Sequence, residues 1–267
     1  MMELSSDYSL TGKRAIVCGS SQGIGRACAI RFATLGAGVT LIARDEAALM
    51  RVRGELATHQ QQQHHVVVAD FTDPSALKER VVAHLAEAGP VQILVNNTGG
   101  PPHGALIETD PQAFLRAMTM HVVCNQTLVQ AVLPGMKAAG YGRVINIIST
   151  SVKEPIPGLG VSNTTRWAVA SWAKTLSREL APLGITVNNV LPGFTDTARL
   201  DALFEAKSKA DGIPKEEVRR QSIEKIPAGR LAGADEIGAA VGFLASPAAS
   251  YINGINLPVD GGRLASL

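Results

Sequence analysis

A glycine-rich stretch near the start of the chain has the residue types and spacing to hold a phosphate group. It reads Cys18-Gly19-Ser20-Ser21-Gln22-Gly23-Ile24-Gly25 and follows the apolar run 15–17. Glycines let the backbone turn tightly and approach a ligand, because no Cβ stands in the way, and free N–H groups at a helix start attract pyrophosphate. The stretch therefore predicts a dinucleotide-binding turn. Such glycines also serve ordinary strand-to-helix turns, so this prediction needs support from other residues.

Apolar runs typical of buried strands alternate along the chain with segments typical of helices. Strands are expected at 15–17, 39–43, 66–69, 93–95, 144–148, 186–191 and 255–259. Helices are expected at 27–35, 46–59, 74–88, 111–139, 162–180 and 235–245. This alternation predicts an α/β fold in which a single-domain, Rossmann-type, doubly wound parallel sheet carries helices on both faces. Ligand-binding residues then lie at the carboxyl ends of the strands.

Two segments fall outside this alternation. Residues 193–228 are charged and less regular, which suits a mobile cover over a substrate pocket or, alternatively, a surface helical insertion. Residues 59–65 are rich in Gln and His; metal binding is conceivable there, but the spacing favours a solvated connection. Neither segment indicates a second domain, so residues 1–267 are expected to form one.

The composition is that of a protein with a large core. Of 267 residues, 46% are hydrophobic and 18% are charged, and the net charge of +2 is spread over segments of mixed sign. No basic block marks a nucleic-acid or membrane-surface partner, and no apolar run reaches the roughly 18 residues of a membrane span. The three cysteines, Cys18, Cys28 and Cys124, lack CxxC spacing. We therefore expect a soluble, cytoplasmic protein with reduced, packed thiols.

Further motifs follow the glycine turn in a set order. They are Asp70 at a strand end, Asn96-Asn97-Thr98-Gly99, Ser149, Pro192-Gly193 and Asp260-Gly261-Gly262. With them, the chain resembles the short-chain dehydrogenase/reductase family over nearly its whole length, and its pattern is similar to that of the 3-oxoacyl-carrier-protein reductases. Cys18 stands where the family usually has Thr, and Thr98 where it has Ala, which mildly perturbs local hydrogen bonding.

The resemblance implies a nicotinamide dinucleotide cofactor, a small carbonyl or alcohol substrate, and a homodimer or homotetramer built on the two long central helices. It assigns cofactor contacts to the glycine turn and to later strand ends. The candidate cofactor-binding residues are Gly19, Ser20, Ser21, Gln22, Gly23, Ile24, Gly25, Arg44, Asp70, Phe71, Asn97, Gly99, Arg166, Pro192, Gly193, Thr195 and Thr197.

Arg44 bears on the choice of cofactor because it directly follows the second strand. An acidic residue at this place would hydrogen-bond the ribose 2′-hydroxyl of NAD, whereas the planar guanidinium of Arg44 suits the 2′-phosphate of NADP. Ser20 or Ser21 could add hydroxyl donors, while the neighbouring Asp45 keeps NAD open. A solvated surface charge is the alternative interpretation of Arg44. The chemistry favours NADP(H) over NAD(H).

The family's catalytic centre joins a Ser to a Tyr-x-x-x-Lys motif on the following helix. Ser149 fits the first position, and counting onward places Ser162 at the Tyr position and Arg166 at the Lys position. The chain has no Tyr between Tyr141 and Tyr251, so this is not an error of register. A Ser hydroxyl is a much weaker acid than a phenol, and an Arg cannot relay protons as Lys does. These two residues therefore put at risk the rate enhancement of roughly 10²- to 10⁴-fold that general-acid catalysis gives.

Other side chains are candidates for the missing proton donor. His121 occupies the family's Asn position on the preceding helix, with Asn125 one turn later on the same face, and Lys153 follows Ser149 in the pocket-side loop. A satisfied or surface histidine and a solvated lysine are the preferred alternatives on position alone. His103, in the Gly/Pro-rich loop, could line the substrate mouth but more simply serves as a loop residue.

The leading functional hypothesis is a divergent NADP(H)-dependent carbonyl reductase or alcohol dehydrogenase, similar to 3-oxoacyl reductases. In it Ser149 polarises the carbonyl and Arg166 holds the nicotinamide ribose. The loss of Tyr and Lys favours a second hypothesis, a catalytically impaired nucleotide-binding protein with a regulatory or scaffolding role. A third, another acid/base reaction, requires His121 and Lys153 to face the nicotinamide site.

Overall fold

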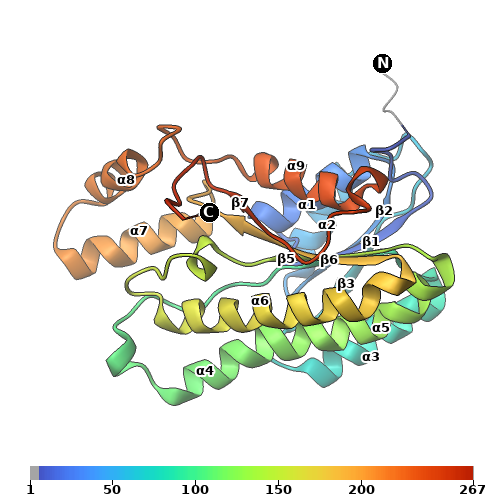
Figure 1. Cartoon of the computed structure of the whole chain (residues 1–267), viewed down its shortest axis with the longest axis horizontal. Helices are drawn as coiled ribbons and strands as arrows, with labels where there is room; N and C mark the ends of the chain where they lie inside the picture. Colours follow the sequence, from blue (N-terminus) through green and yellow to red (C-terminus); the bar gives the residue numbers. More distant parts are fainter. Residues whose placement is uncertain (1–5, 267) are drawn as a thin grey trace.

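One parallel sheet lies between two layers of helices (Figure 1). The computed structural model describes residues 6–266. In sheet order the strands are β3 (His65–Val68), β2 (Gly38–Ala43), β1 (Arg14–Cys18), β4 (Ile93–Asn96), β5 (Gly142–Ile147), β6 (Ile185–Pro192) and β7 (Asn256–Val259). All neighbouring pairs are parallel. The order reverses between β1 and β4, and sheets of this kind bind ligands at such a switch point. The predicted Rossmann-type fold is confirmed.

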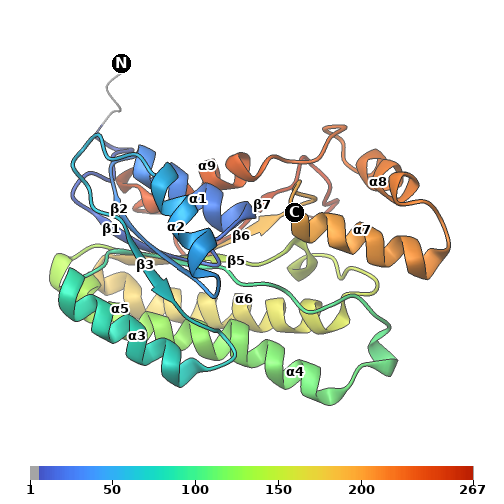
Figure 2. The same ribbon diagram turned by 180° about the vertical axis from the view of Figure 1, so that it is seen from behind.

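The two faces of the sheet bury separate apolar clusters. One is covered by α1 (Gly23–Thr34), α2 (Glu46–Glu55) and α9 (Ala234–Ala245); the other by α3 (Pro74–Ala88), α5 (Cys124–Ala139) and α6 (Gly160–Leu180) (Figures 1 and 2). Alternate residues of β1 point to opposite faces, so Ala15 and Val17 join the first cluster while Ile16 and Cys18 join the second. This explains why the central strands are apolar without interruption.

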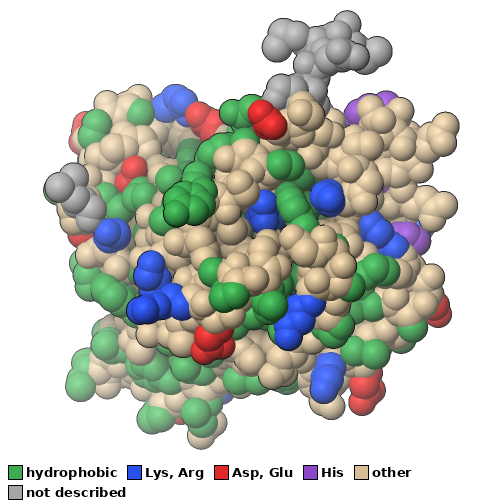
Figure 3. Space-filling view, turned by 45° about the vertical axis from the view of Figure 1, so that its right-hand side comes forward, with side chains coloured by type: hydrophobic (Ala, Val, Ile, Leu, Met, Phe, Trp, Pro, Cys, Tyr) green, Lys and Arg blue, Asp and Glu red, His purple; other side chains and the backbone are tan. Residues whose placement is uncertain are grey.

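The three cysteines pack as expected. Cys18, Cys28 and Cys124 are all buried and free, and burial raises the pKa of each thiol. On the face shown in Figure 3, Lys and Arg side chains are interspersed with apolar and acidic ones. No helix within residues 6–266 is long and apolar enough to cross a membrane.

The segment predicted as a solvated connection is more ordered than expected. α2 ends at Glu55 rather than near His59, because Leu56 adopts an extended conformation. The Gln62 side chain donates to the Ala33 carbonyl at 2.8 Å, and His64 Nδ1 accepts from the Val39 amide at 3.1 Å. Hydrogen bonds from side chains to the backbone therefore fix this turn. No group of three or more His, Cys, Asp or Glu residues suited to a metal occurs in the described part of the chain.

The helix expected over 111–139 is interrupted in its middle. α4 (Pro111–Met118) passes into a π-helical segment, Thr119–Val123, before α5 begins. One wide turn of this kind rotates the side chains that it carries relative to a regular helix, and such turns are frequent at functional sites. It carries His121 into the interior, where only 3% of the residue is exposed.

Residues 193–228 fold mainly as two helices, α7 (Ala198–Asp211) and α8 (Lys215–Glu224), and not as an irregular segment. They extend from one end of the sheet, the same end toward which α4 extends (Figures 1 and 2). Phe204 of α7 and Val218 of α8 share a small apolar cluster that is separate from the two main ones. This pair of helices is called the cover below; its mobility stays a prediction.

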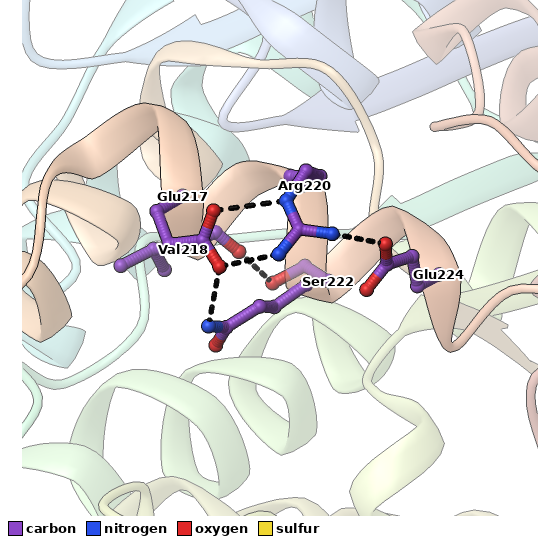
Figure 4. A network of polar contacts seen from close by, with 6 residues as sticks. Glu217, Val218, Arg220, Ser222 and Glu224 are labelled. Carbon is purple, nitrogen blue, oxygen red and sulfur yellow. Dashed lines mark hydrogen bonds and ion pairs between the residues drawn. The ribbon is translucent and has the colours of Figure 1, made fainter.

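Polar contacts along α8 reinforce its exposed side (Figure 4). Arg220 pairs with Glu217, three residues before it, and with Glu224, four residues after it. Hydrogen bonds from Arg220 and Gln221 lower the pKa of Glu217 to about 2. These contacts support a helix whose apolar partners are few.

A row of asparagine side chains crosses the sheet behind the strand ends. Asn96, Asn146, Asn189 and Asn256 lie in register on β4, β5, β6 and β7. Each amide donates to the next oxygen along the row, at 2.8, 2.9 and 2.8 Å. Because buried amides need partners, this row fixes the register of the strands just beneath the functional cleft.

Candidate functional site

A cleft of about 600 Å³ opens at the carboxyl ends of the strands. This size falls in the range of roughly 300–1,000 Å³ that is usual for ligand and cofactor sites. Its wall includes the glycine turn, the ends of β2 and β3, the 97–100 loop, the start of the loop after β5, one side of α6, and the start of the cover. The chemistry predicted from separate parts of the sequence therefore meets in one place.

The glycine turn depends on close backbone approach. A Cβ on Gly25 would lie 2.2 Å from the Gly19 carbonyl oxygen, and one on Gly19 would lie 2.5 Å from that of Asn97. The Asn97 amide also donates to the carbonyls of Cys18 and Gly19, at 3.2 Å each. Asn97 thus joins the ends of β1 and β4, and the turn is closed by contacts that only glycine permits.

The two serines of the turn have different surroundings. Ser20 is fully buried, and its hydroxyl accepts from the Ile42 amide at 3.0 Å, which ties the turn to β2. Ser21, Gln22 and Ile24 line the cleft. The Ser20 side chain therefore does not line the cleft and is held by β2, whereas Ser21 lies on the cleft wall.

Arg44 lies at the end of β2, on the cleft wall, with its side chain 76% exposed. Its guanidinium lies 4.0 Å from the carboxylate of Asp70, which follows β3. The Asp45 carboxylate instead caps α2 by accepting from the Ala48 amide at 2.9 Å. Because Asp45 is occupied in this way, Arg44 is the better placed of the two side chains to meet a ribose substituent. Phe71 completes the wall beside Asp70.

The residues after β6 form the opposite wall. Pro192, Gly193, Thr195 and Thr197 all line the cleft. Thr197 caps α7 by accepting from the Leu200 amide at 3.3 Å, and its methyl group would touch a Cβ on Gly23 at 3.4 Å. Gly193 is required because a Cβ there would lie 2.7 Å from the Cα of Asp260. The closing Asp-Gly-Gly motif thus supports this wall from behind.

Ser149, Ser162 and Arg166 line the cleft together. The Ser149 hydroxyl accepts from the Ser151 amide at 3.0 Å, and Arg166 Nη1 donates to the Ile147 carbonyl at 3.0 Å. Burial, with a contribution from Arg199, lowers the pKa of Arg166 to about 10, so its guanidinium remains charged at neutral pH. None of the tyrosines within residues 6–266 lines the cleft.

His121 lies behind this wall and not on it. Its Nδ1 lies 3.0 Å from the Thr98 hydroxyl, while its buried Nε2 has no hydrogen-bond partner within the described residues. Burial and the nearby Arg166 lower the pKa of His121 to about 2, so the ring is neutral at physiological pH. Thr98 and His121, two residues that are expected to differ from the family pattern, therefore contact each other.

The remaining candidates are not on the cleft wall. Lys153 is half-buried at the end of a short 3₁₀ turn, Thr150–Val152, and Asn125 is buried within α5. The His103 ring packs over Gly158, whose Cβ would lie 2.1 Å from Nε2. The His103 side chain therefore contacts a second loop, which agrees with its simpler interpretation as a loop residue.

Arg199 is a cleft residue that sequence reasoning missed. It lies on α7, donates to the Pro101 carbonyl across the cleft, and lines the wall near Arg166. Its position just after Thr197 was the only signal in the sequence, since no motif requires an arginine there.

Comparisons with known proteins agree with this architecture. A family model described as enoyl-(acyl carrier protein) reductase matches residues 19–263. The chain is 34% identical to the 3-oxoacyl-[acyl-carrier-protein] reductase FabG of Vibrio cholerae, over 95% of this chain and 98% of that protein. It is 29% identical to the NADPH-dependent reductase BacG of Bacillus subtilis, over 97% of this chain and 100% of BacG.

A solved structure gives the same result in three dimensions. L-Sorbose reductase from Gluconobacter frateurii, complexed with NADPH and L-sorbose, superposes with a TM-score of 0.90 at 29% identity. The match covers 98% of this chain and 100% of that one. Together with the family model and the FabG relative, it shows that the chain belongs to the short-chain dehydrogenase/reductase family.

Proposed function

We propose that this protein is a divergent NADP(H)-dependent oxidoreductase that moves hydride between the nicotinamide and a small carbonyl or alcohol substrate, as 3-oxoacyl reductases do. The observation that carries the proposal is one cleft that brings the glycine turn and Arg44 together with Ser149, Ser162 and Arg166. The FabG, BacG and L-sorbose reductase relatives, two of them named with NADPH, support it.

The residues present fit the dinucleotide. Gly19 and Gly25 leave the space that a Cβ would fill, and the amides at the start of α1 are available to a pyrophosphate. Arg44 supplies a charged fork for the 2′-phosphate. When bound, the cofactor supplies the hydride.

The chain's own residues bind and orient the carbonyl. The Ser149 and Ser162 hydroxyls donate to its oxygen, and Arg166 holds the nicotinamide ribose and stabilises negative charge on that oxygen as it develops. A charged guanidinium and two hydroxyls polarise a carbonyl well but transfer a proton poorly, since an alcohol is a much weaker acid than a phenol. We therefore expect normal cofactor binding with slow turnover.

A second function is favoured by the lack of a phenol on the described cleft wall. A protein that binds NADP(H) in the same cleft without turning over substrate would serve a regulatory or scaffolding role. Such a protein would bind NADP(H) as tightly as the proposed oxidoreductase but would not reduce a ketone. A steady-state assay across a panel of ketones separates the two.

The cytoplasm is the compartment that we propose, and a homodimer or homotetramer is the assembly. Exposed apolar side chains on the long central helices support the assembly: Leu115, Val123 and Trp167 are 59%, 47% and 52% exposed. Burial of such a surface favours association. Light scattering after size exclusion gives the mass that tests it.

The test of the cofactor assignment is a fluorescence titration with NADPH and NADH. The parent should bind NADPH more tightly, and Arg44→Ala should weaken NADPH by about tenfold to a hundredfold because a charge-assisted hydrogen bond is lost. NADH affinity should not change, and Arg51→Ala, on the exposed side of α2, serves as the control. Equal affinity of the parent for both nucleotides would remove the assignment.

A further inference from the structure

Two guanidinium groups meet in the substrate half of the cleft. A Cβ placed on Gly100 would lie 3.3 Å from Arg199 Nη2 and 3.7 Å from Arg166 Nη2. One arginine comes from α6 and the other from α7, so both walls of the cleft direct positive charge at the same small volume. Gly100 leaves that volume free of any side chain.

Nothing in the described chain neutralises this charge. Neither Arg166 nor Arg199 forms an ion pair within residues 6–266, whereas several other arginines and lysines pair with a carboxylate. Arg166 is only 8% exposed, whereas Arg199 is exposed at the start of α7; burial, partial for Arg199, lowers the pKa of both guanidinium groups. A buried positive charge beside a second positive charge is unfavourable unless a ligand supplies an anion.

Hydrogen-bond donors also remain for such a ligand. Each guanidinium carries five N–H donors, and the bonds that the structure gives are one from Arg166 to Ile147 and one from Arg199 to Pro101. These bonds fix the orientation of each fork. The acidic residues on the cleft wall, Asp45 and Asp70, lie with Arg44 at the ends of β2 and β3.

We propose that the substrate carries an oxyanion, a carboxylate or a phosphate, which Arg166 and Arg199 bind together above Gly100. The proposal rests on the proposed function, because it names the class of carbonyl compound that this cleft accepts. The pyrophosphate of the cofactor is the other anion that the two arginines could bind. Ser149 and Ser162, which we propose to bind the substrate carbonyl, line the same wall as Arg166. An anion bound by Arg166 therefore lies beside that carbonyl and not beside the glycine turn.

Calorimetric binding to the NADP⁺-loaded protein tests this inference without turnover. The probes are 2-oxopentanoate, 4-oxopentanoate and dihydroxyacetone phosphate, each compared with its neutral counterpart: the two methyl esters and dihydroxyacetone. We expect at least one anion to bind about tenfold to a hundredfold more tightly than its neutral counterpart, since charge-assisted hydrogen bonds are lost in the latter.

Arg199→Gln should remove this preference, because it removes the charge and the guanidinium fork while keeping a polar side chain. Arg199→Lys should keep part of it. Arg219→Gln, on the same cover and paired with Asp196 at 3.6 Å, is the matched control and should keep all of it. NADPH affinity, which also reports correct folding, should be unchanged in all three variants.

Three results would overturn the inference. They are failure of all three anions to bind, an anion preference that survives in Arg199→Gln, and a loss of NADPH affinity in that variant with the anion preference intact. The last would assign the arginine pair to the cofactor pyrophosphate. If the anions bind but no ketone is reduced, the anion site stands and the proposed reductase activity falls; if NADPH does not bind, the same titrations are made on the free protein.

Discussion

The two halves of the cleft are built by different means. In the half around the glycine turn, backbone meets backbone: Gly25 fits against Gly19, and Asn97 joins the ends of two strands. In the half around Ser162, side chains from separate elements meet, and Arg166 of α6 approaches Arg199 of α7. Backbone geometry tolerates few substitutions, whereas a wall made of side chains can change its chemistry while the fold persists.

The positions at which the sequence is expected to depart from the family pattern concentrate accordingly. Ser162, Arg166, His121 and Thr98 all stand in the side-chain half, and Thr98 contacts His121 at 3.0 Å. In the glycine turn the departure is Cys18, whose side chain is buried in the core. The comparison therefore suggests that cofactor binding is retained and that the substrate chemistry has changed.

Restoring the family's residues should produce the largest effect. Ser162→Tyr with Arg166→Lys supplies a phenol beside a cation that tunes it, so the reduction rate of a small ketone should rise by roughly 10²- to 10⁴-fold. Each single variant should give little, because neither group works without the other. Steady-state rates measure this, with melting temperature and NADPH binding as controls. A folded, NADPH-binding double variant that is no faster than the parent on any ketone would show that these positions do not limit catalysis.

The glycine half should fail when its backbone contact is blocked. In Gly25→Ala the new Cβ would lie 2.2 Å from the Gly19 carbonyl, so the turn must open and NADPH should bind about tenfold to a hundredfold more weakly. Gly54→Ala is the control, since nothing lies within 4 Å of its Cβ and α2 gains a better helix former. Nucleotide fluorescence gives both affinities. Normal NADPH binding by Gly25→Ala would mean that the close approach is not needed.

His121 tests the side-chain half through pH. Burial and Arg166 lower its folded-state pKa to about 2, so the unfolded chain, with a pKa near 6.5, binds the proton first as pH falls. Stability from His121 is therefore complete above pH 6.5 and decreases below it, by about 2 kcal/mol between pH 7 and pH 5. His121→Asn should lose that part of the decrease. Urea unfolding at the two pH values measures it.

His84 also makes the free energy of unfolding depend on pH, and its contribution remains in His121→Asn. Burial, with help from His65 and Arg14, lowers the pKa of His84 to about 4, which has the same sign. Some acid sensitivity should therefore persist in His121→Asn. An identical pH dependence in parent and variant would indicate that His121 is not buried as a neutral ring.

The same contrast explains how much the sequence could predict. Strand positions, the helix 74–88 and the glycine turn between a strand and a helix depend on local patterns, and all of them are found where the sequence predicts them, to within a residue or two. The row from Asn96 to Asn256 joins four strands, and the contact between Thr98 and His121 joins a loop to a helix. Such contacts depend on register and on one wide helical turn, neither of which leaves a periodic signal.

Arg199 was missed for the same reason. Its importance comes from Gly100 and Arg166, which are distant in sequence and adjacent only in the fold. Ser20 shows the converse, because its place in the turn suggested a ligand contact, while the neighbouring strand β2 takes up its hydroxyl. A sequence motif can assign a residue to a site, but only the structure shows which group its side chain contacts.

The smallest effect is expected in α8, the helix of the cover that does not line the cleft. Arg220→Ala removes the pairs with Glu217 and Glu224 along the exposed side of α8 (Figure 4). Water screens exposed pairs of this kind, so each contributes little and the global free energy of unfolding should hardly change.

The local effect should nevertheless be measurable. Hydrogen exchange of the α8 amides should become faster, because two side-chain pairs along the helix are lost and its apolar contacts through Val218 are few, while the amides of β1 should be unchanged. Arg116→Ala on α4, which removes a 3.9 Å pair with Asp110, is the control and should leave α8 as it is. Faster exchange in β1 as well would contradict this prediction, because it would mean that α8 and the sheet open together.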